Sequence, residues 1–241
     1  MVSDSLIDMS GLIKGRLVTR YKRFFADIEL DTGEIITAHC PNPGKMLGLL
    51  APGTPALVTH LNDPKKKLQY RLEALAEDGI WIGVNTQWPN RVIPLAIKAG
   101  LIPQLAGYSA LQPEKKYGRN SRIDLYASGH AVRPDAYIEI KNVHLSRQKG
   151  LAEFPDCVTE RGAKHLYELI EMVKDGYRAI VLFCVQRDDC QSFDIARDCD
   201  PGFGRAYDAA REAGVEFMAV GFGVSEAGLR FDRELVIRRP E

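Results

Sequence analysis

The chain has 241 residues, of which 45% are hydrophobic and 27% charged, and its 32 basic side chains equal its 32 acidic ones. This composition excludes a disordered or fibrous chain, and the zero net charge gives no global sign of a polyanionic partner. No stretch approaches the ~20 apolar residues of a membrane span, and the N-terminal MVSDSLIDMS lacks the regions of a signal peptide. Five cysteines without a C-x-x-C pair favour reduced thiols over disulfides or a zinc ribbon. We therefore expect a cytoplasmic protein with no membrane partner.

The first domain, predicted over residues 1–84, consists of short strands separated by turns that contain glycine or proline. The predicted strands cover residues 12–20, 24–30, 34–39, 54–61, 69–76 and 80–84. Residues 46–50 predict one or two helical turns. Six short strands and one small helix indicate a small closed β-barrel. An oligonucleotide/oligosaccharide-binding (OB-like) barrel fits this count, and an SH3-like barrel or a sandwich fits nearly as well.

Beyond residue 84 the pattern changes to alternating helices and strands. Residues 84–100 predict a connecting helix that Pro89 and Pro94 divide into two pieces. Further strands are predicted at residues 121–127, 136–141, 178–185 and 215–220, and helices at residues 159–174 and 201–213. The apolar run RAIVLFCV at 178–185 is typical of a buried central strand. We predict an α/β domain over residues 85–241, with helices on a mixed sheet.

The segment Ile138-Glu139-Ile140-Lys141 carries the strongest chemical signal. Residues two apart in a strand share a face, so Glu139 and Lys141 project together. Asp124 lies on the preceding predicted strand, and a hairpin return would bring it beside Glu139. Two converging carboxylates repel unless a cation lies between them, and hard oxygen ligands favour Mg²⁺ or Mn²⁺. These residues therefore predict a phosphodiester-hydrolysing site in which Asp124 and Glu139 bind the metal and Lys141 acts with them. The plainer interpretation is an ion pair on an amphipathic strand.

Several long segments carry a resemblance to a known family. They are GRLVTRYKRFFADIEL at 15–30, ITAHCPNPGKMLGLLAPG at 36–53, VNTQWPNR at 84–91, GLIPQLAGY at 100–108, KYGRNSRIDLY at 116–126, YIEIKNVHL at 137–145, FPDCVTERGAKHLYELIE at 154–171 and VLFCVQRDD at 181–189. Through them the chain resembles the sugar fermentation stimulation protein family (SfsA) nearly end to end. The resemblance implies an N-terminal OB-like barrel and a C-terminal restriction-endonuclease-like domain similar to PD-(D/E)xK nucleases.

The same resemblance makes Asp124 the acidic residue of the nuclease motif, and Glu139 and Lys141 its E-x-K. It also implies DNA binding without sequence preference and a role in regulating sugar (maltose) metabolism genes. One mild departure is Ala163, which stands where the resemblance leads us to expect a polar residue.

Supporting residues are predicted on the helix at 159–174 and upstream of Asp124. Arg161 and His165 share a helix face, and one or the other is expected to reach a phosphate, whereas Glu160 is expected to help hold metal or water. The alternative is a solvated helix face that begins with an N-cap at Thr159. Glu114 is a candidate third acid, or else an ion-pair partner of a neighbouring lysine.

Two basic regions predict contacts with nucleic acid. Residues 14–23 hold five cations and no acid, with aromatic residues interleaved. This pattern suits phosphate contacts and base stacking, although solubilising charge is the plainer interpretation. A second basic region covers residues 91–122. The expected contacts are Arg16, Arg20, Lys22, Arg23, Lys116 and Arg122.

These features favour a DNA-binding protein, without sequence preference for single or double strands, that carries a nuclease-like divalent-metal site. Three alternatives stay open. The first is an active Mg²⁺-dependent DNA or RNA nuclease. The second is a pure DNA-binding regulator, and the third is a sugar-sensing module without nucleic-acid affinity. The sequence leaves the oligomeric state open, with a homodimer among the options.

Overall fold

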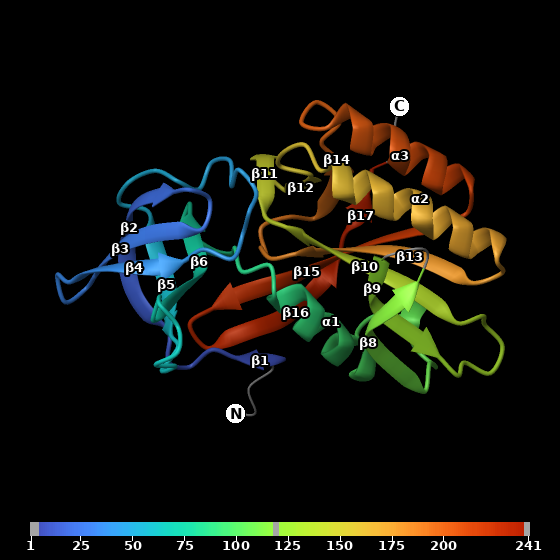
Figure 1. Ribbon diagram of the computed structural model, residues 1–241, viewed down its shortest axis with the longest axis horizontal. Coiled ribbons are helices and arrows are strands. Elements are labelled where there is room, and N and C mark those ends of the chain that lie inside the picture. The colour runs from blue at the N-terminus through green and yellow to red at the C-terminus, as the bar shows by residue number, and fades with distance from the viewer. Residues whose placement is uncertain (1–4, 118–120, 239–241) are drawn as a thin grey trace.

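The computed structural model describes residues 5–117 and 121–238, which form two lobes (Figure 1). One lobe is a small barrel of strands, and the other is a sheet with helices on both faces (Figure 1). Within the described part of the chain, no helix is both long and apolar enough to cross a membrane. All five cysteines are unpaired thiols.

Five strands close the barrel. They are β2 (Ile13–Tyr21), β3 (Phe25–Leu30), β4 (Ile35–His39), β5 (Pro55–His60) and β6 (Tyr70–Glu77). They pair in the order β4-β3-β2-β5-β6, and a parallel contact between β4 and β6 completes the ring. In β3, the alternate residues Ala26, Ile28 and Leu30 are buried, as a strand with one face in the core requires. The closed ring confirms the OB-like barrel and excludes the sandwich.

The helix predicted at residues 46–50 is wrong. Met46 and Gly48 have φ values of +53° and +86°, in the left-handed region. Successive helical hydrogen bonds need φ near −63°, so the chain makes turns at this point instead. Met46 and Leu49 are nevertheless buried in the barrel core.

One sheet continues from the barrel into the second lobe. Strand β7 (Ile80–Gly83) pairs with β6 and, through Trp81 and Val224, with β15 (Glu216–Ser225). The sheet then runs β15-β13-β10-β9-β8. The remaining strands are β8 (Ala110–Tyr117), β9 (Ser121–Ser128), β10 (Ala136–Val143) and β13 (Arg178–Val185). Because β10, β13 and β15 are parallel and β9 is antiparallel, the sheet is mixed, as predicted, with β13 buried inside it.

Several short strands of this lobe were not predicted. Strand β16 (Gly228–Glu234) pairs with β15, and β1 (Ile7–Asp8) pairs with β16, so the segment before the barrel lies in the second lobe's sheet. A separate sheet contains β11 (Leu145–Gln148), β12 (Leu151–Phe154), β14 (Ser192–Ile195) and β17 (Val236–Ile237). These strands of two to seven residues are too short to show a clear period in sequence.

Helix α1 (Trp88–Lys98) is continuous, so the predicted division into two pieces is wrong. Pro89 lies in the first turn, where its missing N–H breaks no helical bond, and Pro94 lies inside the helix. Val92, Ile93 and Ala96 are fully buried against the sheet. This packing stabilises the helix across the proline.

Helices α2 (Glu160–Lys174) and α3 (Pro201–Glu212) lie side by side on the opposite face of the sheet from α1 (Figure 1). The side chains of Thr159 and Asp200 cap them by accepting the N–H groups of Gly162 and Phe203. A short 3₁₀ turn, η1 (Pro103–Leu105), follows α1. In β10, Ile138 and Ile140 pack towards α1, so Glu139 points towards α2.

Candidate metal centre

Asp124 and Glu139 lie on neighbouring antiparallel strands. The pairing of Leu125 with Ile138 places Asp124 beside Glu139, as predicted. Asp124 Oδ2 accepts the backbone N–H of Ile140 at 2.8 Å, and Oδ1 accepts a hydrogen bond from Asn90 Nδ2 at 2.9 Å. The carboxylate thus occupies the place where the β9–β10 backbone ladder ends. Asn90 was missed in sequence because only the packing of α1 brings it here.

Glu139 is 3% exposed, and its two oxygens differ in their surroundings. Oε1 accepts a hydrogen bond from Lys141 Nζ at 2.7 Å and contacts Nδ1 of His165 on α2. Oε2 is buried and has no hydrogen-bond partner within the described residues. A buried carboxylate oxygen without a partner is unfavourable, so Oε2 is suited to a cation ligand.

The two carboxyl groups have opposite pKa shifts. Burial first, and then the charge of Glu139, raises the pKa of Asp124 to about 6, against hydrogen bonds from Ile140 and Asn90. Burial also acts to raise the pKa of Glu139. The Lys141 charge and the His165 contact outweigh it and hold that pKa below its ordinary value. When both carboxyl groups are ionised, the Lys141 ammonium offsets only one of the two negative charges, and a divalent cation would offset the other.

The donors at this point are all oxygen atoms, which fits Mg²⁺, Mn²⁺ or Ca²⁺ better than zinc. They are a carboxylate oxygen of Asp124 and Oε2 of Glu139. The Ile140 carbonyl is a further candidate, because the N–H and C=O groups of one residue in an extended strand face the same side and the Ile140 N–H faces Asp124. Across residues 5–117 and 121–238, no group of three or more His, Cys, Asp and Glu side chains is arranged to hold a metal. Waters would complete the shell of such an ion, as is usual for Mg²⁺.

Helix α2 brings some of the predicted supporting residues to the site and leaves one apart. Arg161 Nε donates to His165 Nε2 at 3.3 Å, so Arg161, His165 and Glu139 form a chain. Glu168 accepts a hydrogen bond from Ser121 Oγ at 2.8 Å on the same side of the helix. Glu160 is exposed and lines a groove between α2 and α3 instead. The structure does not bring Glu160 to the carboxylates.

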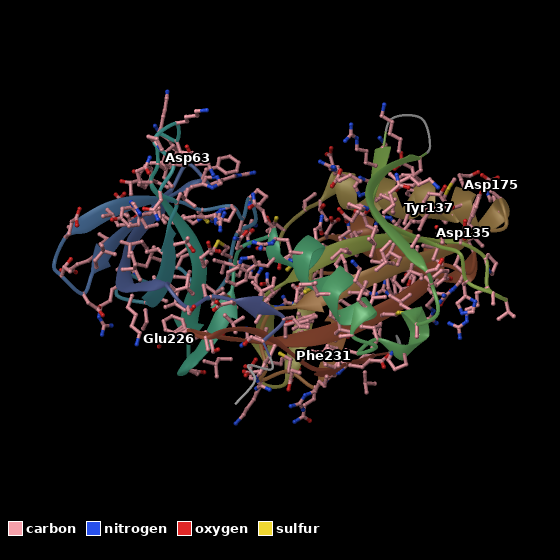
Figure 2. The ribbon with its side chains drawn as sticks, turned by 90° about the horizontal axis from the view of Figure 1, so that it is seen from below. Asp63, Asp135, Tyr137, Asp175, Glu226 and Phe231 are labelled. Carbon is pink, nitrogen blue, oxygen red and sulfur yellow. The ribbon has the colours of Figure 1, made fainter. Side chains whose placement is uncertain are left out.

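A cleft of about 870 Å³ opens in front of the carboxylates, and both lobes line it. The barrel contributes Arg23 and the loop from Asn42 to Gly44. The cations that line it are Arg23, Arg122, Lys141, Arg161 and Lys164, and its other acids are Glu114 and Asp156. Figure 2 shows the two lobes, with Asp63 at the tip of the barrel lobe and Tyr137 and Asp135 at the far end of the other.

Four of the six residues predicted to bind nucleic acid lie outside this lining. Arg16, Lys22 and Lys116 are exposed elsewhere on the surface. The fourth, Arg20, is engaged in the fold: its Nη2 donates to the carbonyl oxygens of Arg23, Asn42 and Gly44 at 2.8, 2.7 and 2.9 Å. The guanidinium therefore joins the β2–β3 turn to the loop that forms the barrel wall of the cleft. Arg20 thus has a positioning role in the fold, and its contact with a phosphate stays a prediction.

Replacing Arg20 by alanine is expected to lower the free energy of unfolding by about 2 kcal/mol, because three carbonyl oxygens lose a charged donor. Urea unfolding measures this change. Arg16→Ala is the matched control, because Arg16 makes one contact, with the Gly53 carbonyl, and is exposed. Equal and small losses in the two variants would show that Arg20 does not hold the cleft wall.

A second contact joins the lobes beneath the cleft. Asp156 Oδ2 accepts the backbone N–H of Met46 at 2.7 Å and lies 3.3 Å from His144 Nε2. Burial acts to raise the pKa of Asp156, but His144 and the Met46 N–H lower it to about 2. A Cβ on Gly44 would lie 2.6 Å from Asp156 Oδ2, so glycine permits this close approach.

Asp156→Asn is expected to reduce the free energy of unfolding by about 2 kcal/mol at pH 7, from a pKa difference of about two units. Because the folded pKa is depressed, this stabilisation is present above pH 3.8 and is lost as the pH falls through about 2. Unfolding by urea between pH 7 and pH 2.5 tests the sign. A difference between wild type and variant that grows towards acid pH would contradict it.

Comparison with known sequences and structures decides the family. The profile described as "Sugar fermentation stimulation protein RE domain" matches residues 87–228, and "SfsA N-terminal OB domain" matches residues 18–84. The chain belongs to the sugar fermentation stimulation protein (SfsA) family. The family assignment from the sequence segments is therefore confirmed.

Curated relatives match almost the whole chain. A sugar fermentation stimulation protein homolog of Rhodospirillum centenum is 51% identical over 93% of this chain and 96% of its own length. The homolog of Caulobacter vibrioides is 45% identical over 93% and 94% of the two chains. A solved structure, entitled "The structure of Pyrococcus Furiosus SfsA in complex with Ca2+", is 25% identical and has a TM-score of 0.88. The match covers 98% of this chain and 99% of that one, so the SfsA fold described above is shared throughout.

Proposed function

We propose that this SfsA protein binds nucleic acid through its phosphates in the cleft between the lobes. There it hydrolyses a phosphodiester bond with Mg²⁺ or Mn²⁺ held by Asp124 and Glu139. The observation that carries the proposal is the unpaired, buried Oε2 of Glu139 beside a carboxyl group whose pKa is raised to about 6. The Ca²⁺ complex of the Pyrococcus furiosus relative supports a hard divalent ion in this fold.

Each group at the site has a distinct chemical task in this proposal. The bound metal would polarise a phosphoryl oxygen and lower the pKa of an attacking water. Lys141 holds an ammonium group beside Glu139, where it can neutralise charge that develops on the phosphate. Arg161 lines the cleft, and its contact with His165 uses only Nε, which leaves its outer nitrogens to grip a phosphate.

The cleft surface favours binding without sequence preference. Arg23, Arg122, Arg161 and Lys164 are exposed cations, which suit phosphates rather than base edges. Phe24, 46% exposed, follows Arg23 on the barrel turn and offers a face for base stacking. Such binding weakens steeply with salt, because each neutralised phosphate releases counterions.

A second candidate is a DNA-binding regulator of sugar metabolism genes that keeps the site without turnover. One observation favours it: only two acidic side chains converge with the Ile140 carbonyl, and within the described residues no third ligand side chain joins them. The two functions share the cleft and differ in whether the bound phosphodiester is cleaved.

Labelled single-stranded DNA, double-stranded DNA and RNA should be incubated with the full chain and Mg²⁺, Mn²⁺, Ca²⁺ or chelator, beside Glu139→Gln. Nuclease action predicts products with Mg²⁺ or Mn²⁺ only, and none from the variant. Dissociation constants at 50–200 mM salt should rise with a log–log slope of several units. Salt-sensitive binding without products would favour the regulator. Salt-independent or absent binding would contradict both candidates and favour a sugar-sensing module, which a sugar-induced rise in melting temperature would reveal.

A further inference from the structure

The ring of His165 has a defined proton arrangement. Its Nε2 receives a hydrogen bond from Arg161 Nε at 3.3 Å. A guanidinium has only donors, so Nε2 must carry a lone pair. The ring proton therefore lies on Nδ1, which faces Glu139 Oε1 and donates to it. His165 thus accepts from Arg161 at Nε2 and donates from Nδ1 to Glu139.

This arrangement makes the two oxygens of Glu139 unequal. Oε1 receives two donors, Nζ of Lys141 from the same strand and Nδ1 of His165 from α2, while Oε2 receives none in the described residues. Rotation of the Glu139 carboxylate away from this orientation would break both contacts of Oε1, so the two donors oppose that rotation. Lys141 alone sits on a flexible stem, so the buried ring of His165 is the more rigid of the two supports.

The ring itself is held in place by the helix that carries it. Helix α2 begins at the Thr159 cap and is fixed further along by Glu168, which accepts from Ser121 on β9. Leu166 and Leu169 are fully buried beneath it. The position of Glu139 is therefore set by packing between α2 and the sheet, and not by strand β10 alone.

We propose that His165 is a positioning residue: as the Nδ1–H tautomer it holds Oε1 of Glu139 and so presents Oε2 to the divalent cation. The cation in this inference rests on the proposed function, whereas the tautomer does not. When a residue that hydrogen-bonds to a metal ligand is removed, the affinity for the metal commonly falls 10–100-fold. A residue that merely fills space between α2 and the sheet would have no such effect.

Two substitutions separate these roles. In His165→Asn the amide nitrogen lies near the position of Nδ1, so the donor to Glu139 is kept and the contact with Arg161 is lost. In His165→Gln the amide reaches the position of Nε2, so the contact with Arg161 is kept and the donor to Glu139 is lost. Both remove the ring and differ from each other by one methylene group, so their melting temperatures without metal should be similar.

The first measurement is a long-range ¹H–¹⁵N NMR spectrum of the metal-free wild-type protein at pH 7, with the His165 signals assigned by their absence in His165→Asn. The expected result is a protonated Nδ1 and an unprotonated Nε2. A ring protonated on Nε2, or on both nitrogens, would overturn the inference whether or not the protein binds metal.

The second measurement is Mn²⁺ affinity by electron paramagnetic resonance titration. His165→Gln is expected to bind Mn²⁺ 10–100-fold more weakly than wild type, and His165→Asn within about threefold of it. Wild-type affinity in His165→Gln would overturn the inference and leave the proposed function standing. A wild-type protein that binds no Mn²⁺ would overturn the metal site of the proposed function, and the cation-presenting role of His165 with it.

Discussion

Lys141→Met is expected to lower the rate of metal-dependent phosphodiester cleavage about 10²–10³-fold, the usual effect of removing one group that stabilises transition-state charge. Affinity for DNA is expected to stay nearly unchanged, because the proposed function assigns DNA binding to the exposed cations of the cleft. The Lys141 side chain is only 12% exposed beside Glu139, so its charge acts where water screens it poorly. Single-turnover cleavage and equilibrium binding, measured on the same DNA, separate the two effects.

Lys174→Met is the matched control for Lys141. Lys174 lies at the exposed end of α2, where it pairs with exposed Glu171 and does not line the cleft. This variant should cleave and bind as wild type does. Circular dichroism should show both variants folded. Equal cleavage rates for Lys141→Met and wild type would show that Lys141 has no role in catalysis.

Asp124→Asn is expected to stabilise the metal-free protein at pH 8 by about 3 kcal/mol, since a pKa raised by about two units makes ionisation of Asp124 unfavourable in the folded state. The variant is expected to be the more stable protein because the pKa of Asp124 is raised in the folded state. Asp124 is neutral in both states below pH 3.8, and wild-type stability then falls as the pH rises to about 6. The variant avoids that loss. Its melting temperature at pH 8 with chelator should exceed that of wild type by roughly 6–12 °C.

Added metal should reverse this order. A divalent ion at 100 times its dissociation constant stabilises the protein that binds it by about 2.7 kcal/mol, and it should do so for wild type alone. Metal affinity of the wild type should also weaken below pH 6, where protons compete for Asp124. Calorimetry measures the melting temperatures of wild type and Asp124→Asn under four conditions: at pH 8 and at pH 5, each with Mn²⁺ and with chelator. A metal-induced rise of equal size in Asp124→Asn would place the ion elsewhere.

Much of the fold could be read from local pattern. The alternation of apolar and acidic residues along Ala26–Leu30 identified a barrel strand, and the apolar run at Arg178–Val185 identified the central strand. Local chemistry also identified the catalytic candidates. A two-residue spacing puts Glu139 and Lys141 on one face of any strand. A hairpin between the two strands is enough to bring Asp124 beside Glu139. The resemblance of long segments indicated the SfsA family before any contact was known.

Tertiary contacts decided the rest. Arg20 has the sequence character of a phosphate ligand, yet it donates to three carbonyl oxygens, one on the β2–β3 turn and two in the loop at residues 42–44. Pro94 lies inside α1 because burial against the sheet outweighs a local preference.

By itself the sequence determined which residues share a face along each strand and helix, because that depends on the fixed repeat of the backbone. Local pattern indicated a small β-barrel, the longer helices and strands around the central β13, and the convergence of Asp124, Glu139 and Lys141. The choice of an OB-like barrel came from the family resemblance. Only the tertiary structure decided that Asn90, His165 and the Asn42–Gly44 loop surround them. Those partners come from residues far apart in the chain, and their meeting depends on how α1, α2 and the barrel pack against one sheet, which no local period records.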